Sequence, residues 1–232
     1  MAMDMAMDHR SLKDALYAQF ARIGAALASE RRLELLDLLA QAPRHVEALA
    51  AETAMSVANT SQHLQALKNA RLVEARRAGA RVEYRLADDS VARMWLALRE
   101  VGEARLSEVR EISRDFGLDE SRGEMVHREQ LEGLSGEGSI LLLDVRPRHE
   151  QEHGHIPGAV LIPHDELESR LDELPRDRRI VAYCRGEYCL FADAAVELLR
   201  RRGFDAVRLD GGWLEWMVEG RPSDSAAIAA QP

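Results

Sequence analysis

Two cysteines, Cys184 and Cys189, are the only ones in this chain of 232 residues, and they open and close a six-residue loop. The run Ile180 to Tyr183 before the loop is apolar and bounded by charged residues, which predicts a buried strand. The run Phe191 to Leu199 after it carries apolar residues at helical spacing. A loop between a strand and the start of a helix faces backbone N–H groups and the positive end of the helix dipole. We therefore expect Cys184 to ionise more readily than a free thiol.

Three further segments accompany this loop in a fixed order. They are Leu143-Asp144-Val145-Arg146, Glu152-His153-Gly154-His155-Ile156-Pro157-Gly158-Ala159 and Leu209-Asp210-Gly211-Gly212-Trp213. Together with the loop, these segments resemble the motifs of the rhodanese sulfurtransferases, over about residues 124–222. The resemblance implies an α/β domain in which Cys184 is the catalytic nucleophile and carries a persulfide sulfur.

The other side chains of the active-site loop set its charge. Arg185 places a cation beside the nucleophile, and Glu187 opposes it. Gly186 and Tyr188 complete the loop before the second cysteine. Sulfur transfer needs a thiolate, backbone donors around it and access for a sulfur donor. Because Glu187 disfavours a dianionic donor such as thiosulfate, we expect an uncharged or small donor of sulfane sulfur, either a low-molecular-weight persulfide or hydrogen sulfide oxidised on the thiol.

Two interpretations of Cys189 stay open. As a resolving thiol, it would convert a persulfide or sulfenic acid on Cys184 into a disulfide or polysulfide bridge. As a structural residue, it would lie buried in the first turn of the following helix. We expect Asp144 and Arg146 to form a structural ion pair near the pocket. A phosphatase of the same fold would need Arg six positions after the nucleophile to hold a phosphate, and that position is Leu190.

The charge of the chain is divided unevenly. The formal net charge is −9, yet residues 1–100 hold 14 Lys and Arg against 13 Asp and Glu, and the remainder holds 17 against 27. This asymmetry predicts different partners for the two halves, with no nucleic acid on the acidic one. No apolar run reaches the ~18 residues of a membrane span, and residues 1–8 lack the basic start of a signal peptide. We expect a cytoplasmic protein without a disulfide framework.

The N-terminal half predicts short helices followed by a hairpin. Apolar spacing and capping residues predict helices over Leu12–Leu27, Glu30–Gln41, His45–Thr53 and Val57–Ala70. Ser56 is the expected N-cap of the last helix, which should bury Thr60, Leu64 and Leu67. Alternating segments at 72–77 and 81–86 predict a hairpin that carries several arginines. A helix-turn-helix followed by a basic hairpin is typical of DNA-binding domains.

This half resembles the arsenic-repressor (ArsR) family of winged-helix regulators over about residues 11–105. The resemblance is carried by Arg32-Leu33-Glu34-Leu35-Leu36, by the helix from Ser56 to Leu67, and by the hairpin. It implies a double-stranded DNA operator as partner and a DNA-facing surface made by Ser56, Val57, Ala58, Ser61, Gln62 and His63. Arg77 and Arg81 of the wing would neutralise phosphates. The other interpretation of this helix face is a solvated polar surface.

The resemblance also implies a homodimer formed by the first and last helices of the domain. The last helix, predicted over Asp88–Ser113, has an apolar stripe suited to a dimer, although the same stripe could pack within its own domain. Many family members sense metals through cysteines on the helix that precedes the recognition helix. That helix has none here, so we expect no metal site and no cofactor.

These patterns predict two domains. Residues 11–112 form a mainly α winged helix with a β-hairpin wing, 113–123 a linker, and 124–222 an α/β rhodanese-like domain with a mostly parallel sheet. The termini, 1–10 and 223–232, are expected to be disordered. The predicted function is a DNA-binding regulator, of the repressor type, coupled to a domain that senses or transfers sulfane sulfur. The alternative is a sulfurtransferase enzyme that uses its winged helix mainly to dimerise.

Overall fold

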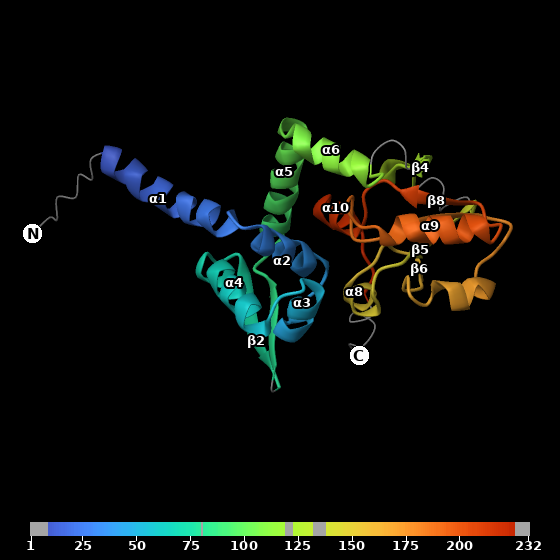
Figure 1. Cartoon of the computed structure of the whole chain (residues 1–232), viewed down its shortest axis with the longest axis horizontal. Coiled ribbons are helices and arrows are strands. Elements are labelled where there is room, and N and C mark those ends of the chain that lie inside the picture. The colour runs from blue at the N-terminus through green and yellow to red at the C-terminus, as the bar shows by residue number, and fades with distance from the viewer. Residues whose placement is uncertain (1–8, 80, 119–122, 132–137, 226–232) are drawn as a thin grey trace, which may run out of the picture. The chain divides into compact units, whose positions relative to one another are not determined.

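The computed structural model describes residues 9–79, 81–118, 123–131 and 138–225 (Figure 1). Two compact units divide the chain, Met1–Trp95 and Leu96–Pro232. Among the described residues, no helix combines the length and the apolar character that a membrane span requires. The predicted disordered ends lie mostly outside the described residues, as does part of the predicted linker, at 119–122.

The first unit is built on four helices that share one core. They are α1 (His9–Leu27), α2 (Glu30–Gln41), α3 (Val46–Glu52) and α4 (Val57–Asn69). In α4 the buried residues are Thr60, Leu64 and Leu67, as helical spacing predicts. Ser56 caps this helix, since its hydroxyl accepts a hydrogen bond from the Asn59 N–H at 3.2 Å.

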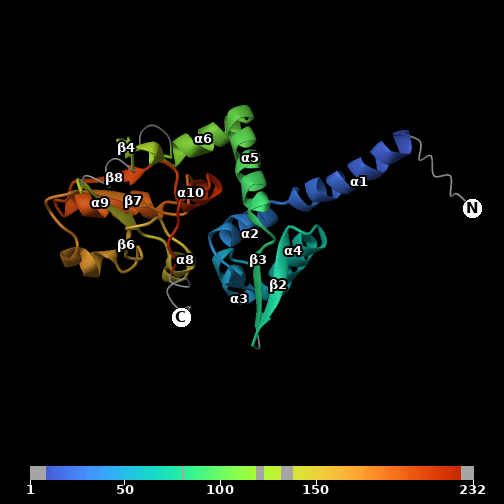
Figure 2. The same ribbon diagram turned by 180° about the vertical axis from the view of Figure 1, so that it is seen from behind.

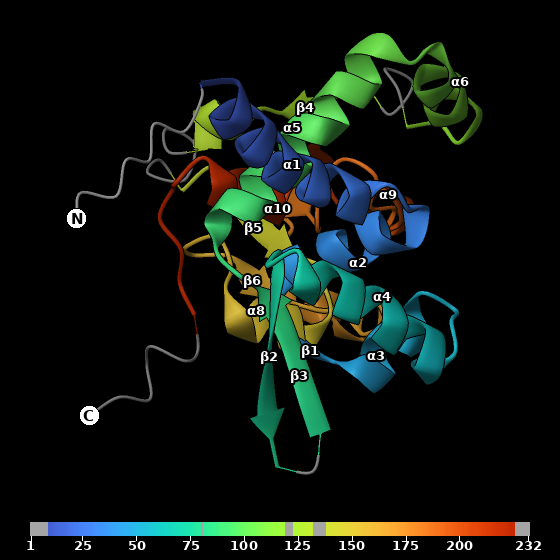
Figure 3. The ribbon, with the colours of Figure 1, turned by 90° about the vertical axis from the view of Figure 1, so that its left-hand side faces the viewer.

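An antiparallel hairpin follows these helices and extends beyond α3 and α4 (Figure 3). Its strands are β2 (Val73–Ala78) and β3 (Arg81–Leu86), paired so that Arg76 lies opposite Glu83. A third strand, β1 (Arg44–His45), pairs with β3. Two residues are too short for alternation to show, so the sequence did not predict β1.

The helix predicted over Asp88–Ser113 is divided in two. The parts are α5 (Asp89–Arg105) and α6 (Ser107–Asp115), and Leu106 between them has extended backbone angles of φ −101° and ψ 112°. The start of the predicted apolar stripe packs within the first unit, where Val91 is buried. Leu98 and Val101, farther along the same helix, are 40% and 58% exposed.

The second unit contains a five-stranded parallel sheet in the order β4-β8-β7-β5-β6. The strands are β4 (Met125–Val126), β5 (Ile140–Asp144), β6 (Val160–Leu161), β7 (Arg179–Tyr183) and β8 (Ala206–Leu209). The sheet is covered on both faces. Helix α9 (Phe191–Arg201) lies along β7 and β8 (Figure 2), and packs with Leu141, Leu143 and Ala182. Helix α10 (Trp213–Val218) packs on the other face, against Leu142 and Val181. A sheet buried on both faces explains why its central strands are continuous apolar runs.

Several short elements complete the second unit. The predicted rhodanese-like domain begins with β4 and a 3₁₀ turn at Arg128–Gln130. A 3₁₀ helix, Leu167–Glu173, lies between β6 and β7. The six-residue helices α8 (Arg148–His153) and α10 were not predicted, because six residues give less than two turns of periodicity.

The buried ion pair after β5 provides a test of what stabilises the second unit. Asp144 and Arg146 form a salt bridge at 2.7 Å, and both side chains are fully buried. Asp144→Ala would leave the guanidinium unpaired inside the protein, so we expect a loss of about 3–5 kcal/mol in the free energy of unfolding. Glu197→Ala is the matched control, because Glu197 pairs with Arg201 on the surface. Urea unfolding followed by tryptophan fluorescence measures both, and equal midpoints would contradict the role of the pair.

Candidate functional site

The cysteine loop leaves the central strand of the sheet and enters α9. Cys184 follows β7 directly, and Leu190 is the N-cap residue of the helix. In parallel α/β sheets, ligands bind beside the carboxyl ends of the strands, which is where this loop lies. Cys184 is completely buried, whereas Cys189 is half-buried and Tyr188 is 40% exposed.

Four successive carbonyl oxygens of the loop are hydrogen-bonded. The backbone N–H of Trp213 donates to the Cys184 carbonyl at 2.9 Å, and that of Leu214 donates to the Arg185 carbonyl at 3.1 Å. The Arg208 guanidinium donates to the carbonyls of Gly186 and Glu187, both at 3.1 Å. The N-terminus of α10 and one side chain of β8 therefore hold the loop in place.

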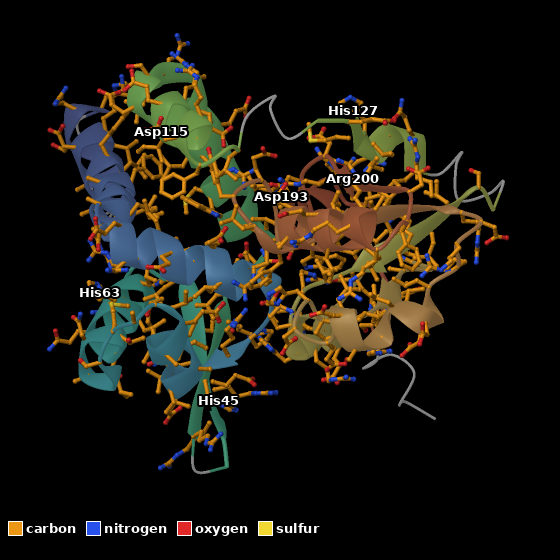
Figure 4. All side chains as sticks on the ribbon, turned by 45° about the vertical axis from the view of Figure 1, so that its right-hand side comes forward. His45, His63, Asp115, His127, Asp193 and Arg200 are labelled. Atoms are coloured by element: carbon orange, nitrogen blue, oxygen red, sulfur yellow. The ribbon has the colours of Figure 1, made fainter. Side chains whose placement is uncertain are left out.

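Arg208 is a functional residue that the sequence analysis missed. Its side chain is only 3% exposed, and its guanidinium also pairs at 3.1 Å with Asp193, which lies on α9 (Figure 4). In the sequence, the feature that could have identified Arg208 is its position as the single charged residue within the apolar run Ala206-Val207-Arg208-Leu209. A charge in a central strand needs a buried partner, and here the loop carbonyls and Asp193 supply it.

Gly212 permits the close approach of α10 to the loop. A Cβ atom at this position would clash with the Cys184 carbonyl oxygen and would lie 2.6 Å from the Gly186 nitrogen. This contact explains why the Gly211-Gly212-Trp213 motif needs glycine at position 212. The missing side chain lets the first N–H groups of α10 reach the loop carbonyls.

Arg185 is bound to a buried carboxylate and does not face the loop alone. Its Nε donates to Glu150 Oε1 at 2.8 Å, and its terminal nitrogen lies 2.6 Å from the same oxygen. Glu150 is fully buried on α8, a helix too short to show a periodicity by which this residue could be found. The positive charge expected beside Cys184 is therefore largely neutralised by Glu150.

The two thiols lie against one another. The Cys184 thiol is 3.3 Å from the Cys189 carbonyl oxygen, to which it donates. Burial raises the pKa of Cys184 well above its usual value. A hydrogen bond from the Cys184 thiol, helped by the backbone N–H groups of Arg185 and Phe191, lowers the pKa of Cys189 to about 7. The raised pKa of Cys184 is contrary to the expectation that this thiol ionises readily, because its burial outweighs the loop dipoles.

The exposed end of the loop is bound to α5. The Tyr188 hydroxyl donates to Glu103 Oε1 at 2.7 Å, and the Arg99 guanidinium lies 5.6 Å from the centre of the Tyr188 ring. Arg99 also donates to Glu215 Oε1 at 2.5 Å. Burial, together with the bond to Glu103, raises the pKa of Tyr188, so this hydroxyl stays protonated. All of these residues belong to the unit that begins at Leu96.

The predicted ion pair of Asp144 and Arg146 connects two segments of the backbone. Arg146 bonds Asp144 and also donates to the Gly154 carbonyl at 2.6 Å, which ties the end of β5 to the Glu152–Ala159 segment. His155 contacts the Gln151 carbonyl at 2.9 Å. Within the described residues, no group of three or more His, Cys, Asp or Glu side chains is arranged to hold a metal ion.

The predicted DNA-facing residues gather at the start of α4 and on the hairpin. Ser56, Val57, Ala58 and Gln62 are exposed, and Ser61 and His63 are half-buried, with His63 labelled on α4 in Figure 4. On the hairpin, Arg76 pairs with Glu83 and Arg85 pairs with Glu74. Arg77 and Arg81 are exposed and make no ion pair with any residue that the structure describes. These two cations are therefore available to a polyanion.

Comparison with protein families matches both halves of the chain. Residues 127–219 match the rhodanese-like domain, and residues 29–75 match the bacterial regulatory proteins of the arsR family. The HTH-type transcriptional regulator Rv0324 of Mycobacterium tuberculosis is 47% identical over 219 residues, which is 93% of this chain and 94% of the relative. A sulfurtransferase of Allochromatium vinosum is 33% identical over 90 residues, which is 38% of this chain and 82% of that protein.

Among solved structures, the chain is similar to the homodimeric winged helix-turn-helix DNA-binding domain of Mb0332 from Mycobacterium bovis, fragment 1–100. The two are 51% identical with a TM-score of 0.39, and the similarity covers 40% of this chain and 87% of that structure.

The lowered pKa of Cys189 predicts how its rate of alkylation depends on pH. With its pKa lowered to about 7, alkylation of Cys189 by iodoacetamide should rise as the pH passes through about 7 and then level off. Cys184→Ala removes the hydrogen bond, so the profile should move up toward the ~8.5 of a free thiol. Peptide mass spectrometry after timed alkylation measures both profiles. Faster labelling of Cys184 than of Cys189 in the wild type would contradict this assignment.

Proposed function

The chain belongs to the arsR family of bacterial regulatory proteins and carries a rhodanese-like domain after its winged helix, and we propose that it is a repressor whose DNA affinity responds to sulfane sulfur held on Cys184. The observation that carries this proposal is the cysteine loop itself. Its nucleophile lies buried at the end of the central strand, and its outer residue, Tyr188, is hydrogen-bonded to α5.

The DNA-binding half of the proposal rests on α4 and the hairpin. The exposed start of α4 offers short polar side chains that would reach base edges, with Gln62 as the longest of them. Arg77 and Arg81 would neutralise phosphates of a double-stranded operator. The relative Rv0324, matched over nearly its whole length, is an HTH-type transcriptional regulator.

A homodimer would present two such surfaces to a two-fold symmetric operator. Helix α1 supports this state, because it carries large apolar side chains that its own unit leaves exposed. These are Leu12, Leu16, Tyr17 and Phe20, which are 43%, 47%, 68% and 61% exposed. Apolar residues that gather on one exposed helix are typical of an interface with another copy or partner.

The sulfur half of the proposal rests on the loop. A persulfide on Cys184 would form where four carbonyls are already bound and where the neighbouring cation, Arg185, is paired with Glu150. Glu187 is then the charged loop residue that meets an incoming donor, and it would repel thiosulfate. A low-molecular-weight persulfide or a polysulfide fits this loop better.

Helix α5 would couple the two halves. Its first turns bury Val91 and Ala92 in the first unit, and its later turns place Arg99 and Glu103 beside the loop. A modification that moves Tyr188 would change its bond to Glu103 and so the position of the helix. Coupling of this kind requires two sites and an element that both of them bias.

A sulfurtransferase that uses the winged helix only to dimerise remains the alternative function. Its support is the similarity to the sulfurtransferase of Allochromatium vinosum, which is confined to 38% of this chain. The unpaired Arg77 and Arg81 favour the regulator, since dimerisation alone does not need free cations on a hairpin. A phosphatase would require an Arg at the position of Leu190.

The wing arginines give the first test of this proposal. Arg77→Ala with Arg81→Ala should weaken binding to all DNA sequences and reduce the salt dependence of the affinity by about one counterion per lost phosphate contact. Arg76→Ala is the matched control, because Arg76 is already paired with Glu83. Fluorescence anisotropy with the upstream DNA of the gene, titrated with salt, measures the slope. The same slope in the double variant as in the wild type would remove the wing from the interface.

Polysulfide treatment provides the second test. We expect it to lower operator affinity by about 5–150-fold, which corresponds to a coupling free energy of about 1–3 kcal/mol. Cys184→Ser should bind DNA like the reduced protein and ignore polysulfide, because it lacks the sulfur atom that would carry the persulfide. Tyr188→Phe should take up sulfur and respond less, because it lacks the hydroxyl that binds Glu103. Gel-shift titrations of the three proteins, reduced and treated, measure the response. If the treated and untreated wild type bind equally, the two domains act independently.

A further inference from the structure

The second thiol of the loop is placed to act on a persulfide at the first. We propose that Cys189 attacks the inner sulfur of a Cys184 persulfide, closes a Cys184–Cys189 disulfide and releases sulfide. The rhodanese-like unit would then reduce sulfane sulfur, and would not only hold it. This inference rests on the proposed function in one respect, namely that Cys184 accepts the sulfur.

The positions of the two residues support the attack. Cys184 donates its thiol proton toward Cys189, with 3.3 Å between its sulfur and the Cys189 carbonyl oxygen. The chain returns to Cys184 because the Cys189 N–H bonds the Gly186 carbonyl at 3.2 Å, which forms a turn inside the loop. The backbone of one loop thus brings Cys189 against the Cys184 sulfur.

The loop is held in this conformation from outside. Arg208 binds the carbonyls of Gly186 and Glu187, and α10 binds those of Cys184 and Arg185. Because the loop backbone is already held in place, little conformational entropy is lost when the two cysteine sulfurs react with each other. This favours attack by Cys189 over attack by a thiol from another molecule.

Burial separates the roles of the two sulfurs. Cys184 is completely buried, so a thiol from another molecule has poor access to its inner sulfur. Cys189 is half-buried and already lies beside it. The chain has no other cysteine, so Cys189 is the one thiol of the same chain that can resolve the persulfide.

The local charge also suits Cys189 as the attacking group. In the reduced loop a hydrogen bond from the Cys184 thiol lowers the pKa of Cys189, and the backbone N–H groups of Arg185 and Phe191 lower it further. The two backbone N–H groups remain in place when Cys184 carries the added sulfur, so they continue to lower the pKa of Cys189. A thiol whose pKa lies near the ambient pH is close to the optimum for thiol–disulfide exchange.

The reaction balances without any further oxidant. The Cys189 thiolate and the Cys184 persulfide, Cys184–S–SH, give the Cys184–S–S–Cys189 disulfide and HS⁻. The new bond joins the two cysteine sulfurs, and the bond that breaks joins the inner and outer sulfurs of the persulfide. Two electrons pass from the cysteine sulfurs to the sulfane sulfur, which leaves as sulfide with its proton. Two equivalents of a thiol reductant would then restore both thiols.

The test uses the reduced full-length protein and a limited amount of a low-molecular-weight organic persulfide, which gives up its outer sulfur and leaves as a thiol without releasing sulfide. Wild type, Cys189→Ser and Cys184→Ser are compared for sulfide released and for intact mass. The wild type should release about one equivalent of sulfide per protein chain. Its intact mass should fall by the mass of two hydrogen atoms relative to the reduced protein, and dithiothreitol should restore the original mass. Cys189→Ser should gain one sulfur, keep it, and release sulfide at least about tenfold more slowly. Cys184→Ser should do neither.

The outcomes separate this inference from the proposed function. A wild type that keeps an added sulfur with Cys189 free would overturn the disulfide step and leave Cys184 as the sulfur carrier. A bridge that retains the extra sulfur and releases no sulfide would also overturn it. Equal sulfide release by wild type and Cys189→Ser would show that an outside thiol resolves the persulfide. If Cys189→Ser takes up no sulfur at all, Cys184 is not the acceptor, and the proposed function itself fails.

Discussion

The hydrogen bonds to the carbonyl oxygens of the cysteine loop are the interactions on which the second unit depends. They require a guanidinium at Arg208 on β8 and free N–H groups at the start of α10. Both donors are fixed by the sheet, because β8 pairs with β7 and because α10 buries Trp213 and Trp216 against the face opposite α9. Gly212 is needed between them, since any Cβ atom there would strike the loop.

This arrangement decides the chemistry of the two thiols. A loop at the N-terminus of a helix should favour a thiolate, and by that reasoning Cys184 would carry the charge. Complete burial of Cys184 opposes this, because desolvation penalises a charged sulfur. The pKa of Cys189 is instead lowered, by a hydrogen bond from the Cys184 thiol and by the backbone N–H groups of Arg185 and Phe191. In the proposed reaction, the cysteine that would hold the sulfur and the cysteine that would attack it are two different residues of one loop.

Helix α5 begins in the first unit and ends beside the cysteine loop of the second unit. Val91 and Ala92 pack it into the first unit, and Glu103 binds Tyr188 of the loop. The pairing of Arg99 with Glu215 adds a second bond between this helix and the elements that hold the loop. The proposed coupling would pass from the loop through this hydrogen bond and then along one helix toward the first unit. The break at Leu106 ends that helix just after Glu103, so the bond to Tyr188 is made by its last turns.

The sequence by itself determined the features that are local in the chain. Helical spacing identified the buried face of α4, Ser56 its cap, and alternation the hairpin. Apolar runs identified the central strands, and the cysteine spacing identified the loop. Only the tertiary structure brought Arg208, Glu150 and Glu103 to that loop. Glu103 and Tyr188 are 85 positions apart, and no periodicity or spacing records such a contact. The balance of charge between Cys184 and Cys189 was likewise decided by burial, which results from the packing of the sheet and helices around the loop.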